Sequence, residues 1–142
     1  MARVSEAVAH AKKLSPAQRA FLENPFVGAV TDLRPDGSPH STVVWVDVDD
    51  DGVSFNTARP RAKPRYLEAD PRVSLLVLDP DDPYRWISIT GTTTMVDEGA
   101  NDQIDRLSLK YTGRDEYGSH REGETRVSVR ISPTWIESRG LD

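Results

Sequence analysis

A chain of 142 residues with 37% hydrophobic and 29% charged residues suits one globular domain rather than a disordered segment. Its formal net charge of −5 argues against general affinity for nucleic acid or anionic membranes, because such binding needs many cations. With 0 cysteines, disulfides, thiol catalysis and cysteine-bound zinc are excluded.

The first 23 residues are predicted to be helical rather than a targeting segment. Apolar residues recur at helical spacing from Ala7 to Leu14, and Ser15-Pro16 is typical of an N-cap and first helical residue that open a second short helix. We see no apolar run of signal-peptide or membrane-spanning type, so we expect a cytoplasmic protein.

Short runs of β-branched and apolar residues predict strands along the rest of the chain. We predict strands at 26–33, 40–48, 53–57, 72–79, 86–96 and 125–131, with 133–138 as an added edge strand. The run RVSLLVLD at 72–79 is nearly all apolar, as in a strand buried on both faces. Gly91 marks a bulge or bend.

Two helices are predicted to interrupt the strands. Pro60 suits the first turn of a helix over 60–69, and Asp97 suits the cap of a helix over 98–112. Six or more strands, mostly antiparallel, with few helices indicate a mainly β fold with flanking helices, a closed or nearly closed barrel. We expect one such domain over residues 1–142, with the barrel over 26–138.

The acidic turn DVDDDG at 47–52 imitates the start of a calcium loop. Its twelfth position is Ala58, where a bidentate glutamate is needed, so we interpret it as a hairpin turn. The three histidines are widely separated and lack metal-ligand spacing, so no metal site is predicted. His40 opens a strand beside Ser41 and could reach a ligand, or it is an exposed strand-end residue.

Four cations, Arg59, Arg61, Lys63 and Arg65, occupy every second position where a strand gives way to a predicted helix. Like charges so close repel one another unless solvent or an anion compensates them. At a helix N-terminus they would meet free backbone N–H groups. Two readings remain open: a phosphate or carboxylate site, or a solvated basic turn paired with neighbouring acids.

The neighbouring segments supply the other parts of a candidate site. Ser54, Asn56 and Thr57 offer neutral hydrogen-bond donors beside the cations. The strand HSTVVWVDV could hold a ring system through its backbone groups and the small side chains of Ser41, Thr42 and Val43. Trp45 is assigned to the core.

Residues 35–91 resemble the split β-barrel superfamily that includes the pyridoxamine 5′-phosphate oxidases. The resemblance is carried by DG-x-P-H at a hairpin, N-T-A-R-x-R-x-K-x-R after it, and DPRVSLLVLDPD-x-PYR. Taken together these segments look most like the deazaflavin-dependent oxidoreductases that use coenzyme F420. The similarity extends over about residues 20–133.

The resemblance implies a homodimer of split barrels with cofactor sites at the subunit interface. The cofactor ring would lie along the second strand, and its phosphate would meet the basic segment. A partner subunit would add a third group of residues, and reduced coenzyme F420 would pass a hydride to a small electrophilic organic substrate. The implied cofactor-binding residues are Ser41, Thr42, Val43 and Val44 for the ring, Asn56, Thr57, Arg59, Arg61, Lys63 and Arg65 for the phosphate, and Tyr84, Arg85 and Trp86 from the partner.

Some features depart from the family pattern. Pro60 and Pro64 stand where smaller residues are usual, and Trp135 stands where a smaller or charged residue is expected. The strand arginine of the FMN-binding oxidases is not found, which favours coenzyme F420 and leaves FMN as the alternative cofactor. A non-catalytic flavin carrier is the other alternative. No residue is identified as the proton donor; His40 and Tyr84 are candidates.

Overall fold

The computed structural model describes residues 13–141. The part of the predicted N-terminal helical segment that precedes residue 13 lies outside that range. The described chain opens with helix α2, Pro16–Leu22. Ser15 accepts a hydrogen bond from the Gln18 backbone N–H at 3.1 Å, and the Gln18 side chain accepts one from the Ser15 N–H at 2.9 Å. This capping box confirms the predicted helix start at Ser15-Pro16.

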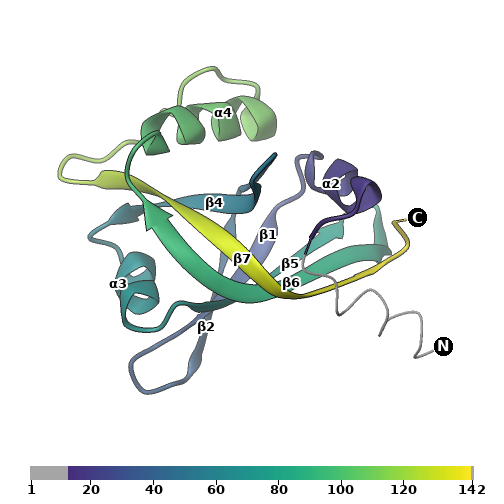
Figure 1. Ribbon diagram of the computed structural model, residues 1–142. Coiled ribbons are helices and arrows are strands. Elements are labelled where there is room, and N and C mark those ends of the chain that lie inside the picture. Colours follow the sequence, from purple (N-terminus) through teal and green to yellow (C-terminus); the bar gives the residue numbers. More distant parts are fainter. Residues whose placement is uncertain (1–12, 142) are drawn as a thin grey trace.

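The fold is a half-barrel made by one curled antiparallel sheet (Figure 1). Its described strands, in the spatial order β2-β1-β5-β6-β7-β4-β3, confirm the predicted fold class. The bounds are β1 Gly28–Leu33, β2 Pro39–Val44, β3 Val46–Asp49, β4 Gly52–Arg59, β5 Arg72–Asp79, β6 Asp82–Val96 and β7 Thr125–Arg139.

The single strand predicted over 40–48 is wrong, because the chain changes edge at Trp45. β2 pairs with β1 at one edge of the sheet, whereas β3 pairs with β4 at the other. Only Trp45 separates β2 from β3, so the two edges of the sheet meet at this residue. The acidic turn is the predicted hairpin, with Asp49 opposite Gly52.

β5 is buried on one face only in the single chain, contrary to the prediction. Its residues alternate, so that Leu75 and Val77 are fully buried while Leu76 and Leu78 are 41% and 40% exposed. The exposed leucines lie on the outer face of the sheet. The run of apolar residues thus predicted the strand correctly, but it did not predict that one face of the strand is exposed in the single chain.

Gly91 lies at the predicted bend. Gly91 pairs with Pro133 and Thr90 with Trp135, which leaves Thr134 as an extra residue on β7. A Cβ at Gly91 would lie 2.1 Å from the Ser132 carbonyl oxygen, so glycine is required. The predicted strands 125–131 and 133–138 form one strand, β7, which lies inside the sheet rather than at its edge.

Two further helices cover the openings of the half-barrel. α3, Ala62–Ala69, begins two residues after the predicted start, with Arg61 as its N-cap. α4, Ala100–Thr112, is capped by Gly99 at φ 78°, so the predicted Asp97 cap is wrong. The Asp97 carboxylate instead pairs with Arg59. In Figure 1 α4 lies above β4 and β7, and α3 lies beside β2.

Inward-facing side chains of β1 and β3–β7 fill the interior. The largest fully buried ones include Phe55, Leu75, Ile87, Ile89 and Ile136. Burial of each such side chain contributes about 1.5–3 kcal/mol. This core fixes the strands whose ends carry the polar residues described next.

Candidate functional site

A cavity of about 300 Å³ lies between the end of β2, strand β4, the start of α3, the inner face of α4 and β7. Six residues predicted for cofactor binding line it: Val43, Val44, Asn56, Thr57, Arg61 and Lys63. The others lining it are Trp45, Ile104, Leu107, Tyr117, Ser119 and Arg126. The structure therefore brings the strand residues and two of the four cations to one place.

Arg126 is the most buried cation of the cavity. Its side chain is only 6% exposed, and its Nε donates to the Asn56 Oδ1 at 2.8 Å. Its guanidinium lies over the Tyr117 ring, 5.1 Å from the ring centroid. The Nη1 atom is buried and has no hydrogen-bond partner among residues 13–141. Burial lowers the pKa of Arg126, yet a guanidinium remains charged, so an anion in the cavity would satisfy this donor.

Arg61 and Lys63 reach the same cavity from the start of α3. Arg61 is held by Glu124 through two hydrogen bonds of 2.6 and 3.0 Å, which raise the Arg61 pKa. No hydrogen bond or ion pair is found for Lys63 among the described residues, and burial lowers its pKa. Lys63 and the Nη1 of Arg126 are thus available as donors to a ligand.

A polar network beneath the cavity fixes the position of Arg126. The Asn56 amide donates to the Gln103 Oε1 at 2.9 Å and to the Ala100 carbonyl at 2.8 Å. The Gln103 amide in turn donates to the Ser54 Oγ at 2.9 Å. Because its two N–H groups are held by α4, the Asn56 oxygen must face Arg126.

The opposite wall is apolar and aromatic. Trp45 stacks on Tyr111 with ring centroids 5.5 Å apart and planes 6° from parallel, and meets Tyr117 edge-on at 6.0 Å. The assignment of Trp45 to the core is wrong, because it stands where the chain crosses between the sheet edges and lines the cavity. A flat apolar wall facing clustered cations suits a ring system that carries a phosphate.

The sequence of residues 14–140 matches the family profile described as pyridoxamine 5′-phosphate oxidase. The chain belongs to this family. A solved structure described as an F420 reductase is similar to the chain with a TM-score of 0.74 and 27% identity, over 87% of this chain and 98% of that one. A conserved hypothetical protein from Mycobacterium tuberculosis is similar with a TM-score of 0.71 and 27% identity, over 94% and 89% of the two chains.

Solved structures that share the fold at lower sequence identity include one described as a heme storage protein. HutZ, the heme storage protein from Vibrio cholerae, is similar with a TM-score of 0.65 and 15% identity, over 91% of this chain and 96% of that one. At that identity the likeness concerns the fold alone. The pyridoxamine 5′-phosphate oxidase-like fold binds flavin-type cofactors, and the particular ligand must be argued from this chain's own residues.

Among the residues predicted to bind the ring and the phosphate, four do not line the cavity of this family member. Arg59 turns to Asp97 and Glu68. Arg65 is exposed on α3. Ser41 is exposed and shares a 2.8 Å hydrogen bond with Thr31, whereas the Thr42 hydroxyl is buried without a partner. Strand alternation explains the last pair, because adjacent residues of β2 face opposite sides.

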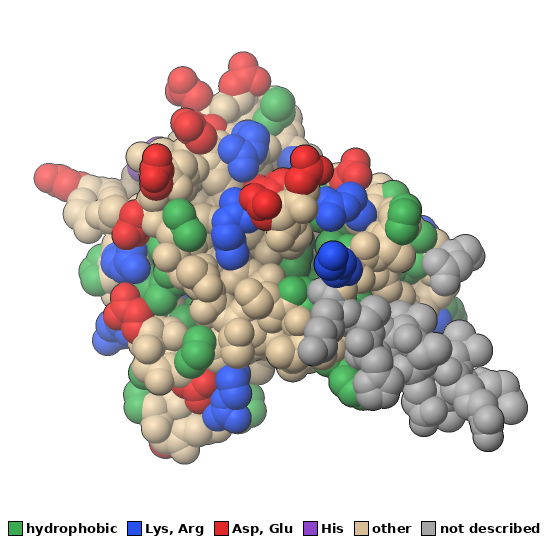
Figure 2. All heavy atoms as spheres, in the orientation of Figure 1, with side chains coloured by type: hydrophobic (Ala, Val, Ile, Leu, Met, Phe, Trp, Pro, Cys, Tyr) green, Lys and Arg blue, Asp and Glu red, His purple; other side chains and the backbone are tan. Residues whose placement is uncertain are grey.

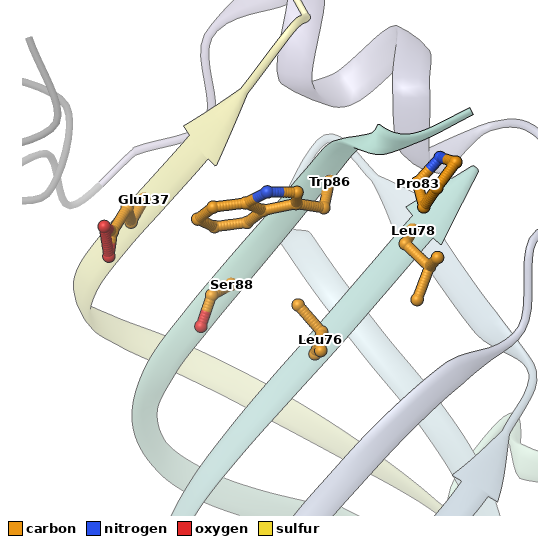
Figure 3. A pocket seen from close by; sticks show the side chains of 6 residues that line it. All are labelled: Leu76, Leu78, Pro83, Trp86, Ser88 and Glu137. Carbon is orange, nitrogen blue, oxygen red and sulfur yellow. The ribbon is translucent and has the colours of Figure 1, made fainter.

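The residues assigned to a partner subunit lie on β6, outside this cavity. Tyr84 is 74% exposed, and Arg85 pairs with Asp79 at 2.6 Å. Trp86 lines a separate groove of about 380 Å³ with Leu76, Leu78, Pro83, Ser88 and Glu137. Figure 3 shows the Trp86 indole lying across this outer face from β6 toward Glu137, with Leu76 and Leu78 on the neighbouring strand β5. Their predicted role in a neighbouring subunit's site stays a prediction.

His40 is tied to a buried acid rather than exposed at a strand end. Its Nδ1 lies 2.7 Å from the Asp32 Oδ1, and Asp32 is 1% exposed. The ring also meets Tyr66 of α3 edge-on at 5.3 Å. Within residues 13–141, no three His, Asp or Glu side chains are grouped to hold a metal ion.

Sequence reasoning missed several cavity residues on the second half of the chain. The list comprises Ile104, Leu107, Tyr117, Ser119 and Arg126. The alternation in TRVSVRI offered a signal, since Arg126 falls on the same side as Ser128 and Arg130 rather than with the valines. Nothing in the irregular segment before β7 indicated that Tyr117 folds back over the cavity.

The surface surrounding the cavity is of mixed charge. Figure 2 shows acidic side chains gathered over the upper part of the molecule around α4, with basic side chains among them rather than in a continuous patch. No described helix is long and apolar enough to cross a membrane. The cavity cations are thus a local feature of an acidic protein.

Proposed function

We propose that this protein is an oxidoreductase that uses coenzyme F420 to transfer a hydride to a small electrophilic organic substrate. The observation that carries the proposal is the cavity that joins a buried, incompletely bonded Arg126 to an aromatic wall at Trp45. The similarity to the protein described as an F420 reductase supports this choice of cofactor.

The fit of the cofactor follows from the donor set. Lys63, Arg61 and Arg126 would hold the phosphate, with Asn56 and Thr57 as neutral partners, while Val43, Val44 and Trp45 would hold the ring. Each charge-assisted contact contributes about 1.5–3 kcal/mol. When bound, the reduced deazaflavin supplies the hydride, and the protein's part is to bind, orient and exclude water.

FMN is the rival cofactor within the same fold. Titration of the purified protein with coenzyme F420, FMN and pyridoxal phosphate, followed by tryptophan fluorescence, separates the candidates. We expect F420 to bind at least about tenfold more tightly than FMN, a difference of about 1.4 kcal/mol. Trp45→Phe should remove most of the signal and Trp135→Phe should not. Equal affinities, or FMN retained through purification, would contradict the assignment.

Turnover separates an enzyme from a cofactor carrier. Purified protein with reduced coenzyme F420 is offered a panel of electrophilic substrates such as enones and quinones, and oxidation of the cofactor is followed by absorbance. We expect reduction of at least one class. Tight cofactor binding without turnover across the panel would favour the carrier.

We further propose that two copies of the chain associate through the outer face of the sheet. In adjacent positions across β5 and β6 this face carries Leu76, Leu78 and Trp86, with Val43 of β2 on the same side and 68% exposed. Exposed apolar side chains in such a row mark an interface. Light scattering should give a dimer at micromolar concentration, and Leu76→Lys should give a monomer. A monomeric wild type would overturn this.

A further inference from the structure

Asp32 is a buried carboxylate of which one oxygen is hydrogen-bonded and the other is not. It lies on β1 opposite His40 of β2, and only its Oδ1 has a hydrogen-bond partner. The Oδ2 atom is buried and has no partner in the part of the chain that the structure describes. A carboxylate in such a place costs free energy unless a cation compensates it.

Besides His40, the cation on which the Asp32 charge acts is Lys63, which belongs to the anion cavity. α3 packs on β1, and His40 contacts the ring of Tyr66 on α3. Tyr66 lies about one helical turn after Lys63, so the Asp32–His40 pair lies close to the part of α3 that carries Lys63. The Asp32 charge acts on the Lys63 ammonium and opposes the lowering of the Lys63 pKa by burial. No other charge partner of Lys63 is found among residues 13–141.

The cavity's charges can therefore be counted. Arg61, Lys63 and Arg126 bring three positive charges, of which Glu124 compensates one and Asp32 another. Among these five side chains one net positive charge remains. A ligand with a single negative charge is matched, whereas a doubly charged ligand would bring an uncompensated charge into a partly buried site.

We infer that Asp32 is a specificity-determining residue, an internal counter-anion of Lys63 that favours a singly charged phosphodiester over a doubly charged phosphomonoester. The inference rests on the proposed role of the cavity in binding a cofactor phosphate. Coenzyme F420 carries a phosphodiester, while FMN and pyridoxal phosphate carry monoesters that are close to doubly ionised at pH 7. Asp32 acts through Lys63 and touches no ligand.

The test measures the affinities of FMN, coenzyme F420 and riboflavin, which lacks phosphate, for wild-type protein and Asp32→Asn. Loss of one nearby negative charge should tighten FMN by about tenfold and F420 by about threefold, and should leave riboflavin unchanged. Asp70→Asn is the matched control, because within residues 13–141 this carboxylate pairs with the exposed Arg72 alone. It should change none of the three affinities.

A double-mutant cycle shows whether Asp32 acts through Lys63. In a Lys63→Met background the gain in FMN affinity from Asp32→Asn should fall to less than about twofold. Asp32→Thr serves as a second variant, since threonine suits a strand and keeps a hydroxyl for His40. Thermal unfolding verifies that each variant is folded before binding is measured.

The outcomes separate this inference from the proposed function. If the wild type binds FMN and F420 but Asp32→Asn leaves both affinities unchanged, weakens them, or shifts riboflavin equally, the inference is wrong and the proposed function stands. If the wild type binds neither phosphate ligand, both are overturned. A gain in FMN affinity that persists without Lys63 also overturns the inference.

Discussion

Two regions of the molecule differ in how their buried side chains are satisfied. One is the part of the sheet made by β5 and β6, and the other is the region around the cation cavity. In the middle of β5 and β6 the inward side chains are apolar and buried, as with Leu75, Ile87 and Ile89, and the buried Asp79 at the end of β5 is paired with Arg85. At Arg126 in the cavity and at neighbouring positions, four buried polar atoms lack a hydrogen-bond partner among the described residues. They are Asp32 Oδ2, Thr42 Oγ1, Arg126 Nη1 and Ser128 Oγ, all on β1, β2 and β7. The first region supplies stability, and the second keeps hydrogen-bonding capacity for something else.

The largest expected effect tests the first half of this comparison. Ile89→Ala should lower the free energy of unfolding by about 2–5 kcal/mol, because the fully buried side chain leaves a cavity in a close-packed core. The affinity of the folded protein for its cofactor should not change. Urea unfolding with and without cofactor measures both. Leu109→Ala, at a 53% exposed position, is the control and should cost less than about 1 kcal/mol.

The second prediction reverses that pattern at Arg126. Arg126→Met removes a buried cation with an unused donor but leaves the Asn56 Oδ1 unpaired, so the free energy of unfolding should fall by about 1–3 kcal/mol. Cofactor affinity should drop by about thirty- to a hundredfold, or about 2–3 kcal/mol. Arg130→Met on the same strand removes a cation that faces only Asp49 and Asp51, and should leave affinity unchanged. A large loss of stability with unchanged binding would make Arg126 a structural residue.

The sequence predicted the first region better than the second for a physical reason. Strand existence follows from local patterns, so β1, β4, β5, β6 and the bend at Gly91 could be anticipated. The cavity depends on tertiary contacts between segments that are far apart in the sequence. Trp45 looked like core because its neighbours are apolar, and Arg126 reaches Asn56 only because β7 returns to pair with β4.

The basic segment shows the same limit within a few residues. Four cations at alternate positions suggested one cluster, yet the structure divides them. Arg61 and Lys63 line the cavity, while Arg59 pairs with Asp97 and Arg65 is exposed. Alternate residues point to the same side only within a β-strand. This segment passes from β4 into α3 between Arg59 and Ala62, so its four cations do not share one side.

That division gives the third prediction. Lys63→Ala should weaken cofactor binding by about tenfold, and Arg61→Ala by less, because Glu124 already compensates Arg61. Arg59→Ala, from the same segment but outside the cavity, should have little effect. Turnover at saturating cofactor should change much less than affinity, because a remote anchor contributes uniform binding. Steady-state kinetics at two salt concentrations test this, and wild-type affinity in Lys63→Ala would return the segment to a solvated basic turn.

The smallest expected effect concerns alkaline pH and again separates stability from binding. Burial lowers the pKa of Lys63 from its ordinary value of 10.5, with Asp32 opposing and Arg61 and Arg126 adding to the shift. The folded protein therefore releases this proton at lower pH than the unfolded chain does. Between the two pKa values the unfolded state binds more protons, so this group makes the free energy of unfolding rise with pH.

Anion affinity should move in the opposite direction over the same pH window, because neutral Lys63 no longer attracts a phosphate. Cofactor affinity and urea unfolding are measured from about pH 7 to about pH 10, in the wild type and in Lys63→Met. Lys110 and Tyr111 also titrate in the alkaline range, and the variant keeps both, so the difference between the two proteins isolates Lys63. The wild type should lose affinity relative to its own neutral value more steeply than Lys63→Met does. Parallel affinity curves would mean that the Lys63 charge takes no part in binding, and the separation between a stabilising region and a ligand-holding region would then rest on Arg126 alone.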